Sequence, residues 1–253
     1  MELNYKKYGA GQPFLILHGL FGSSDNWHTH GKKLAEYFEV YLIDQRNHGD
    51  SEWSDDFDYD IMAEDLHEFI EEHGLKNIIL LGHSMGGKTA MRYAQSHPEN
   101  IDKMIIVDMG IKGYPVTHDV ILEGLASIDV ENITSRREAS EQLAKYVPQP
   151  TVRQFLLKNL HRDKETGFSW KINIPVLTEK LPEIIKELPN EESMVDVLFI
   201  AGGKSDYIVD EDHDDIRKLF SLARFYTIEE AGHWIHAEAP DKFMNKVLEY
   251  TLL

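Results

Sequence analysis

Residues 77–87 read Asn-Ile-Ile-Leu-Leu-Gly-His-Ser-Met-Gly-Gly, a pattern that predicts a strand, a sharp turn and a helix. The continuous apolar run at 78–81 is typical of a strand that is buried on both faces. Glycines two positions before and two after Ser84 leave room for a tight turn into a helix that we expect to begin near Gly87. A serine in that turn is predicted to be a nucleophile, although a serine that only caps a helix is the simpler alternative.

Apolar runs of strand length recur along the chain and alternate with helical patterns. The helical patterns lie at 60–73 and 88–97, and the further apolar runs lie at 13–17, 40–43, 104–107, 197–200 and 224–228. This alternation predicts an α/β fold with a mostly parallel central sheet and helices on both of its faces.

The alternation stops between residues 113 and 189. Leucines there stand among charged residues with no obvious strand, and the rhythm resumes at Val197. We therefore expect one core made of residues 1–112 and 190–253, with a helical insertion at 113–189.

Composition excludes several classes of protein. The 253 residues include 26 Lys plus Arg and 44 Asp plus Glu, a net charge of −18, which argues against nucleic acid as a partner. The absence of cysteine excludes a thiol nucleophile, disulfides and thiolate metal sites. The acidic cluster at 210–215 has the spacing of neither a calcium loop nor a zinc site. We expect no metal and no cofactor, because catalysis by a serine nucleophile requires neither.

The sequence also bears on location. The first residues lack the apolar core of a signal peptide, and no stretch approaches the ~18 apolar residues of a membrane span. We therefore expect a cytoplasmic protein with no membrane partner and a small molecule as its substrate. The oligomeric state is left open.

A serine nucleophile needs a base within hydrogen-bond reach, and in a strand-turn-helix site of this kind the histidine comes last in the chain. His233 follows the last predicted strand and precedes a helix that starts near Pro240. A loop at the carboxyl edge of the sheet would therefore present it, where catalytic groups of open α/β sheets collect. His236 is the alternative.

The negative charge that develops on the substrate needs two backbone donors. Met85, directly after the nucleophile, is predicted to supply one of them. The loop after the first long apolar run is predicted to supply the other, from Leu20 or else from Phe21. We interpret His18 as a residue that supports this loop, and the charges of Asp44 and Arg46 as fixing loops nearby.

The acid that would orient His233 has two candidates, since two aspartates follow predicted strands. Asp108 follows the run at 104–107, and Asp206 follows the run at 197–201 after two glycines. In many α/β-hydrolases, whose nucleophile turn this sequence resembles, the acid stands three residues past the glycine that closes the later strand. Counting from Gly202 reaches Ser205 and counting from Gly203 reaches Asp206, so the residues leave both candidates open.

Together these motifs resemble the α/β-hydrolase superfamily, and within it the YbfF-type bacterial esterases and their mitochondrial α/β-hydrolase-domain relatives. The resemblance spans nearly the whole chain, including two segments of the insertion at 155–158 and 174–177. It rests on His-Gly-Leu-Phe-Gly-Ser at 18–23, Arg-Asn-His-Gly at 46–49, Gly-His-Ser-Met-Gly-Gly-Lys at 82–88 and Gly-His-Trp-Ile-His-Ala-Glu-Ala-Pro at 232–240.

The resemblance implies several further properties. The insertion should be a small helical cap over the active site. The acid should follow the strand after the nucleophile helix, which favours Asp108, with Ser205 standing where other members of the superfamily carry the acid; Asp206 is the alternative. The implied activity is hydrolysis of short-chain carboxylic esters, with acyl thioesters as further substrates.

Other activities are compatible with the same three side chains. An epoxide hydrolase or haloalkane dehalogenase is excluded, because either would carry Asp where Ser84 stands. Carbon–carbon bond hydrolases and perhydrolases use the same set, and a receptor can keep the fold without turnover. We therefore expect a serine carboxylesterase and keep these as alternatives.

Overall fold

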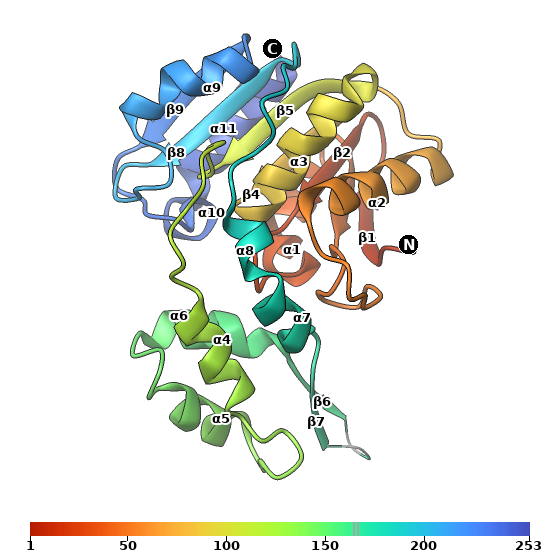
Figure 1. Cartoon of the computed structure of the whole chain (residues 1–253). Helices are drawn as coiled ribbons and strands as arrows, with labels where there is room; N and C mark the ends of the chain where they lie inside the picture. Colours follow the sequence, from red (N-terminus) through yellow and green to blue (C-terminus); the bar gives the residue numbers. More distant parts are fainter. Residues whose placement is uncertain (164, 166) are drawn as a thin grey trace.

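A seven-stranded sheet forms the centre of the computed structural model, which describes residues 1–163, 165 and 167–253. The strand order is β1-β3-β2-β4-β5-β8-β9, and every neighbouring pair is parallel except β1 with β3. The strands span Tyr5–Gly9 (β1), Pro13–Leu17 (β2), Glu39–Ile43 (β3), Ile78–His83 (β4), Ile101–Val107 (β5), Val197–Gly202 (β8) and Ala223–Ile228 (β9). The fold is the expected one (Figure 1).

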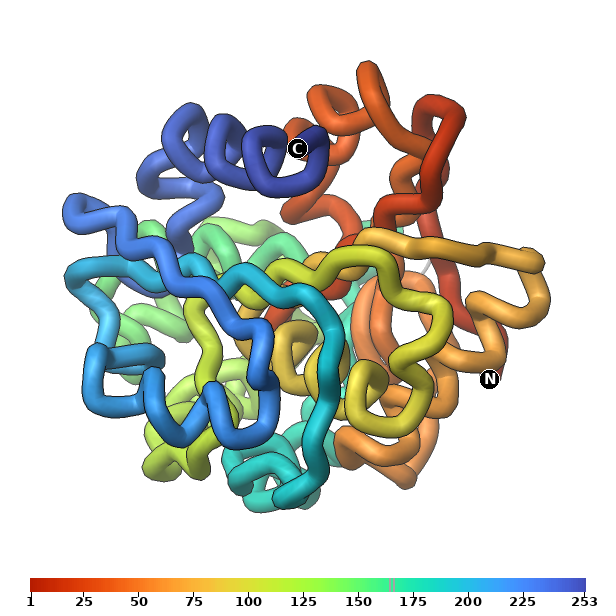
Figure 2. Tube along the Cα trace, turned by 90° about the horizontal axis from the view of Figure 1, so that it is seen from above, coloured from red at the N-terminus to blue at the C-terminus, as the bar shows by residue number. Residues whose placement is uncertain are grey.

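Both faces of the sheet are covered by helices, which is why its central strands β2, β3, β4, β5 and β8 are largely continuous apolar runs. Leu15 and Leu17 pack with α2 and α3 on one face, whereas Phe14 and Ile16 pack with α1 and α11 on the other. Figure 2 shows α11, in blue, and the α2–α3 pair, in orange and yellow, on opposite sides. The core helices are α1 (His28–Leu34), α2 (Tyr59–Glu72), α3 (Met85–Ser96), α9 (His213–Leu219), α10 (Ile235–Glu238) and α11 (Pro240–Leu252).

One strand of the central sheet is absent from the predicted set. β1 is an antiparallel edge strand whose side chains are half-buried or exposed, and its sequence Tyr-Lys-Lys-Tyr-Gly carries no apolar run. Such an edge strand forms because its backbone pairs with β3, a contact that the pattern of side chains does not report.

The insertion leaves the core after β5 and returns before β8. Figure 1 shows its main elements grouped on one side of the sheet. Its helices are α4 (Asp119–Ala126), α5 (Arg136–Leu143), α6 (Pro150–Leu156), α7 (Ile174–Glu179) and α8 (Leu181–Ile185).

The insertion is mostly helical, as expected, but it also contains an antiparallel hairpin of β6 (Leu160–Asp163) and β7 (Gly167–Trp170), which the sequence analysis did not predict. Most side chains of this hairpin are exposed and charged or polar, so neither strand has the apolar pattern of a buried one. Short 3₁₀ turns complete the described structure at Ser24–Trp27, Pro98–Asn100, Leu157–Asn159 and Asp210–Asp212. In the part of the chain that is described, no helix is both long enough and apolar enough to cross a membrane.

Candidate active site

Ser84 occupies the turn between β4 and α3 in a strained backbone conformation, with φ 53° and ψ −121°. Both glycines of the motif are required, because a side chain has no room at either position. A Cβ atom on Gly82 would lie 2.2 Å from the carbonyl oxygen of Gly86, and one on Gly86 would lie 2.5 Å from that of Leu17. The helix begins at Met85, directly after the serine, and not near Gly87 as expected. Ser84 therefore stands at the N-terminus of α3 itself, where the helix dipole is strongest.

His233 lies between Ser84 and Asp108, although the three residues come from distant parts of the chain. The distance from His233 Nε2 to Ser84 Oγ is 3.0 Å, and that from His233 Nδ1 to Asp108 Oδ2 is 2.7 Å. His233 belongs to the loop between β9 and α10, and its side chain is 19% exposed. The ring can therefore exchange a proton with the serine while its other nitrogen donates to the carboxylate.

The carboxylate of Asp108 is fully buried at the end of β5. Its Oδ1 accepts a hydrogen bond from the Gly202 backbone at 2.9 Å, and its Oδ2 also accepts one from the Ser205 hydroxyl. Asp206, the alternative acid, is exposed on the neighbouring turn. Of the two aspartates, the structure places Asp108 against His233.

The loop at 18–22 lies against the nucleophile, because a Cβ atom on Gly19 would be 3.0 Å from Ser84 Cβ. Within this loop the N–H of Phe21 donates to Nε2 of the buried His48 at 3.2 Å. Phe21 also has a positive φ of 62°, a left-handed conformation that is uncommon outside glycine. Of the two expected donors in this loop, Phe21 is therefore engaged elsewhere, which favours Leu20.

His18 is buried behind the same loop. Its Nδ1 lies 2.9 Å from the Gly19 carbonyl oxygen, and its Nε2 accepts the Gln45 N–H at 3.0 Å. Burial lowers the pKa of His18. A neutral ring that donates on one side and accepts on the other holds the loops after β2 and β3 together, which suits the supporting role expected for His18.

A cavity of about 210 Å³ opens beside Ser84. Its walls come from both parts of the chain, with Leu20, Trp27 and Trp234 from the core and Ile121, Val152 and Phe155 from the insertion. These six side chains are apolar, and the polar part of the lining consists mainly of Ser84 and histidines. The cavity can therefore take a small apolar group next to the serine, and the insertion forms one of its walls.

Two rings that the sequence analysis did not single out lie against His233. Tyr207 stacks on it with ring centroids 4.1 Å apart, and His83 Nε2 lies 2.9 Å from the His233 carbonyl oxygen. Burial, together with the neighbouring His233, lowers the pKa of His83 to about 3, so His83 is a neutral donor. In the sequence, the position of His83 in the Gly-His-Ser motif could have pointed to it, whereas no pattern pointed to Tyr207.

His236, the alternative base, is buried and stacks on Trp27 with centroids 4.3 Å apart. Burial lowers its pKa well below the usual value. Because the contact with Ser84 Oγ is made by His233, we assign His236 to packing behind the site.

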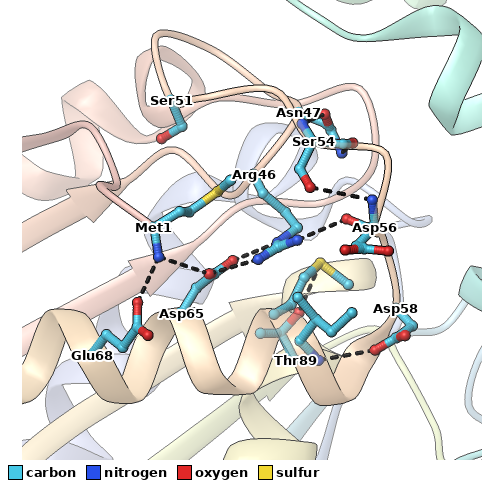
Figure 3. Close-up of polar contacts among 12 residues, drawn as sticks. Met1, Arg46, Asn47, Ser51, Ser54, Asp56, Asp58, Asp65, Glu68 and Thr89 are labelled. Carbon is cyan, nitrogen blue, oxygen red and sulfur yellow. Dashed lines mark hydrogen bonds and ion pairs between the residues drawn. The ribbon is translucent and has the colours of Figure 1, made fainter.

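Arg46 anchors the loop that carries His48 onto α2 (Figure 3). Its guanidinium makes two hydrogen bonds to Asp65, at 2.5 and 2.7 Å, and one to the Asp56 carbonyl oxygen at 2.7 Å. Arg46 and Asp65 are 6% and 4% exposed. A buried pair of this geometry holds the loop in place, as expected for Arg46, and leaves it no part in the chemistry.

Replacing Asp65 with alanine is expected to lower the free energy of unfolding by about 3–5 kcal/mol, since the buried guanidinium of Arg46 would lose its counter-charge. Urea denaturation followed by circular dichroism measures this change. Asp60→Ala on the same helix is the matched control, because Asp60 pairs with Arg92 at an exposed position and should contribute less than about 1 kcal/mol. Equal losses in both variants would contradict the prediction.

Known proteins resemble this chain over most of its length. Residues 12–126 match the family model described as alpha/beta hydrolase fold. The sn-1-specific diacylglycerol lipase ABHD11 of Mus musculus is 36% identical over 247 residues, which cover 93% of this chain and 80% of the relative. This chain is an α/β-hydrolase.

Two further relatives extend nearly from end to end. The hydrolase is 31% identical over 258 residues to Esterase YbfF of Escherichia coli, with 99% of each chain covered. A solved structure titled "Marine microorganism esterase" shares 43% identity with the hydrolase, covers 98% of both chains and superimposes with a TM-score of 0.95. The resemblance expected from the motifs is confirmed, and these relatives place the hydrolase with esterases and lipases.

Proposed function

We propose that this α/β-hydrolase is a serine carboxylesterase that cleaves short-chain acyl esters. One observation carries the proposal: the His233 ring lies within hydrogen-bond distance of both Ser84 Oγ and Asp108 Oδ2, beside a small apolar cavity. This is the arrangement by which a neutral serine becomes nucleophilic.

Ser84 Oγ attacks the acyl carbon while His233 Nε2 takes the hydroxyl proton. The imidazolium that forms is oriented and stabilised by Asp108 through the Nδ1–H bond. When the tetrahedral intermediate collapses, the bond to the alcohol breaks and the alcohol leaves with the proton from Nε2. A water molecule then attacks the acyl-enzyme with His233 again as base, releasing the carboxylic acid and restoring Ser84.

The backbone N–H groups of Leu20 and Met85 are the proposed donors to the oxyanion. Met85 is the first residue of α3, where backbone amides have no partner within the helix. Leu20 lines the cavity from the loop packed against Ser84. Each donor would lower the barrier by about 3 kcal/mol.

The size of the cavity suggests which acyl groups fit. An apolar cavity of roughly 150 Å³ holds a benzene molecule, so about 210 Å³ accepts an acyl chain of only a few carbons. A long chain would have to displace side chains of the insertion or remain in water.

The test is a p-nitrophenyl acyl series from acetate to palmitate. We expect kcat/KM to be highest between acetate and hexanoate and to fall by about tenfold or more at palmitate, because the extra methylenes find no room. Phe155→Ala should move the optimum to longer chains by enlarging the cavity, whereas Tyr37→Ala, which removes an exposed ring, should leave it in place. Rates are read from nitrophenolate absorbance.

Inertness toward every ester would contradict the esterase proposal. It would favour a carbon–carbon bond hydrolase or perhydrolase if a fluorophosphonate probe still labelled Ser84, and a ligand receptor if the probe did not. Labelling is read as a mass increase on the peptide that contains Ser84.

Acyl thioesters are a second candidate class, supported by one cation near the site. Lys158 lines a further cavity of about 550 Å³ that shares Phe155, Trp234 and His236 with the cavity at Ser84. The net charge of −18 would repel a substrate with an anionic leaving group, and a cation beside the cavity would offset this repulsion. The same acyl series offered as coenzyme A thioesters separates the two classes.

A further inference from the structure

Lys88 is a fully buried lysine on α3, one helical turn beyond Ser84. Its ammonium group donates a hydrogen bond to the Lys112 carbonyl oxygen at 2.9 Å and a second one to the Lys186 carbonyl oxygen. These two carbonyls belong to the two connections between the core and the insertion. One side chain of the nucleophile helix therefore binds both ends of the insertion.

The two connections run side by side where Lys88 meets them. Leu188 N–H donates to the Ile111 carbonyl at 2.9 Å, and Tyr114 N–H donates to the Ile185 carbonyl at 2.8 Å. On the outside, a cleft of about 600 Å³ borders this junction, so that side is not filled by packing. The Lys88 ammonium joins both connections to α3 at this point, and Gln95 of the same helix donates to the Pro189 carbonyl oxygen further along the second connection.

A second set of contacts leads from the junction to the candidate active site. The Tyr114 ring lies 5.0 Å from Lys88 Nζ. The Tyr114 hydroxyl accepts the Gly110 N–H at 2.8 Å and donates to the Tyr207 carbonyl oxygen at 2.7 Å. Tyr207 in turn stacks on His233.

Burial of the Lys88 ammonium is unfavourable, because water no longer solvates the charge. It lowers the pKa of Lys88 to about 7, against the opposing influence of Glu187. A lysine that served only to fill space would be replaced at lower cost by an apolar side chain of similar length. The two hydrogen bonds from the ammonium to carbonyl oxygens offset this unfavourable burial, because hydrogen bonds from a charged donor are strong.

We propose that Lys88 is a positioning residue that holds the insertion closed over Ser84. The proposal rests on the esterase function proposed above, because it concerns how the acyl group is bound. Ile121, Val152 and Phe155 of the insertion line the acyl cavity, and their distance from Ser84 depends on the junction that Lys88 ties to α3.

Lys88→Met tests this directly, since methionine keeps most of the length and removes the ammonium. We expect KM for p-nitrophenyl butyrate to rise about tenfold while kcat changes less than about threefold, because loss of a cavity wall removes binding shared by ground and transition states. Hydrogen–deuterium exchange should speed up about tenfold across residues 119–185 and stay unchanged in β4 and β5.

Lys103→Met is the matched control. Lys103 on β5 also donates to two carbonyl oxygens, those of Tyr250 and Thr251, at 2.9 and 3.5 Å, but it lies far from the junction. This variant should lose stability without a change in KM or in exchange across the insertion. Lys88→Gln, which restores a neutral hydrogen-bond donor, should have a KM between those of Lys88→Met and wild type.

Three results would overturn the inference. The first is an unchanged KM together with unchanged exchange in the insertion of Lys88→Met. The second is an equal KM effect in Lys103→Met. The third is failure of both Lys88 variants to fold while Lys103→Met folds, which would make Lys88 a requirement of the core. If wild type hydrolyses no ester, the esterase proposal fails, whereas the exchange experiment still tests whether Lys88 holds the insertion.

Discussion

Replacing Asp108 with asparagine is expected to lower kcat for a short p-nitrophenyl ester by about 10⁴-fold, the loss observed when the acid of another serine triad becomes an amide. An asparagine keeps the hydrogen bonds from Gly202 and tolerates the positive φ of 47° at this position, so the fold should remain. The amide cannot stabilise the imidazolium, and it favours the wrong tautomer of His233. Steady-state rates on purified variants measure the effect.

Asp206→Asn is the matched control, because this change also replaces a carboxylate by its amide on the same side of the sheet. Asp206 is exposed and His233 Nδ1 already meets Asp108 at 2.7 Å, so its rate should stay within about twofold of wild type. A large loss in Asp206→Asn with an active Asp108→Asn would reverse the assignment of the acid.

Replacing Ser84 with alanine is expected to lower kcat by at least about 10⁴-fold, since the nucleophile is removed while the cavity and the oxyanion donors remain. The same variant should take up no label from a fluorophosphonate probe. Retained labelling at another serine, or a rate near that of wild type, would show that a different residue carries the reaction.

Ser84→Gly distinguishes a strained turn from an ordinary one. Ser84 is held at φ 53° and ψ −121°, a conformation that glycine adopts without strain. We expect the glycine variant to be as inactive as Ser84→Ala. Its free energy of unfolding, measured in urea, should exceed that of Ser84→Ala by about 1 kcal/mol. A glycine variant less stable than the alanine variant would mean that the turn stores no strain.

The local parts of this molecule follow from short patterns in the sequence. Continuous apolar runs marked the five central strands β2, β3, β4, β5 and β8, because burial on both faces requires an apolar residue at nearly every position. The spacing of Gly82 and Gly86 around Ser84 marked the turn, since both positions touch backbone atoms where a Cβ has no room. These constraints act within a few residues, so they are visible in the chain itself.

Elements with mixed side chains were not predictable in the same way. The edge strand β1 and the hairpin of β6 and β7 carry polar residues on exposed faces and form through backbone pairing. The start of α3 at Met85 also escaped prediction, because the strained conformation of Ser84 lets the helix begin at once.

The contacts between distant residues required the folded chain. In the sequence, a shift of one residue in the turn after β8 decided whether Asp206 or Ser205 stands at the usual position of the acid, which left Asp108 and Asp206 as candidates. The fold brings Asp108 to His233 across 125 positions. The choice of Leu20 over Phe21 depends on where His48 lies. In the sequence, Lys88 is an ordinary lysine of a helix. Only the fold shows that its ammonium donates to one carbonyl oxygen at each end of the insertion. Such distances follow from the paths of intervening loops, and no short stretch of sequence encodes those paths.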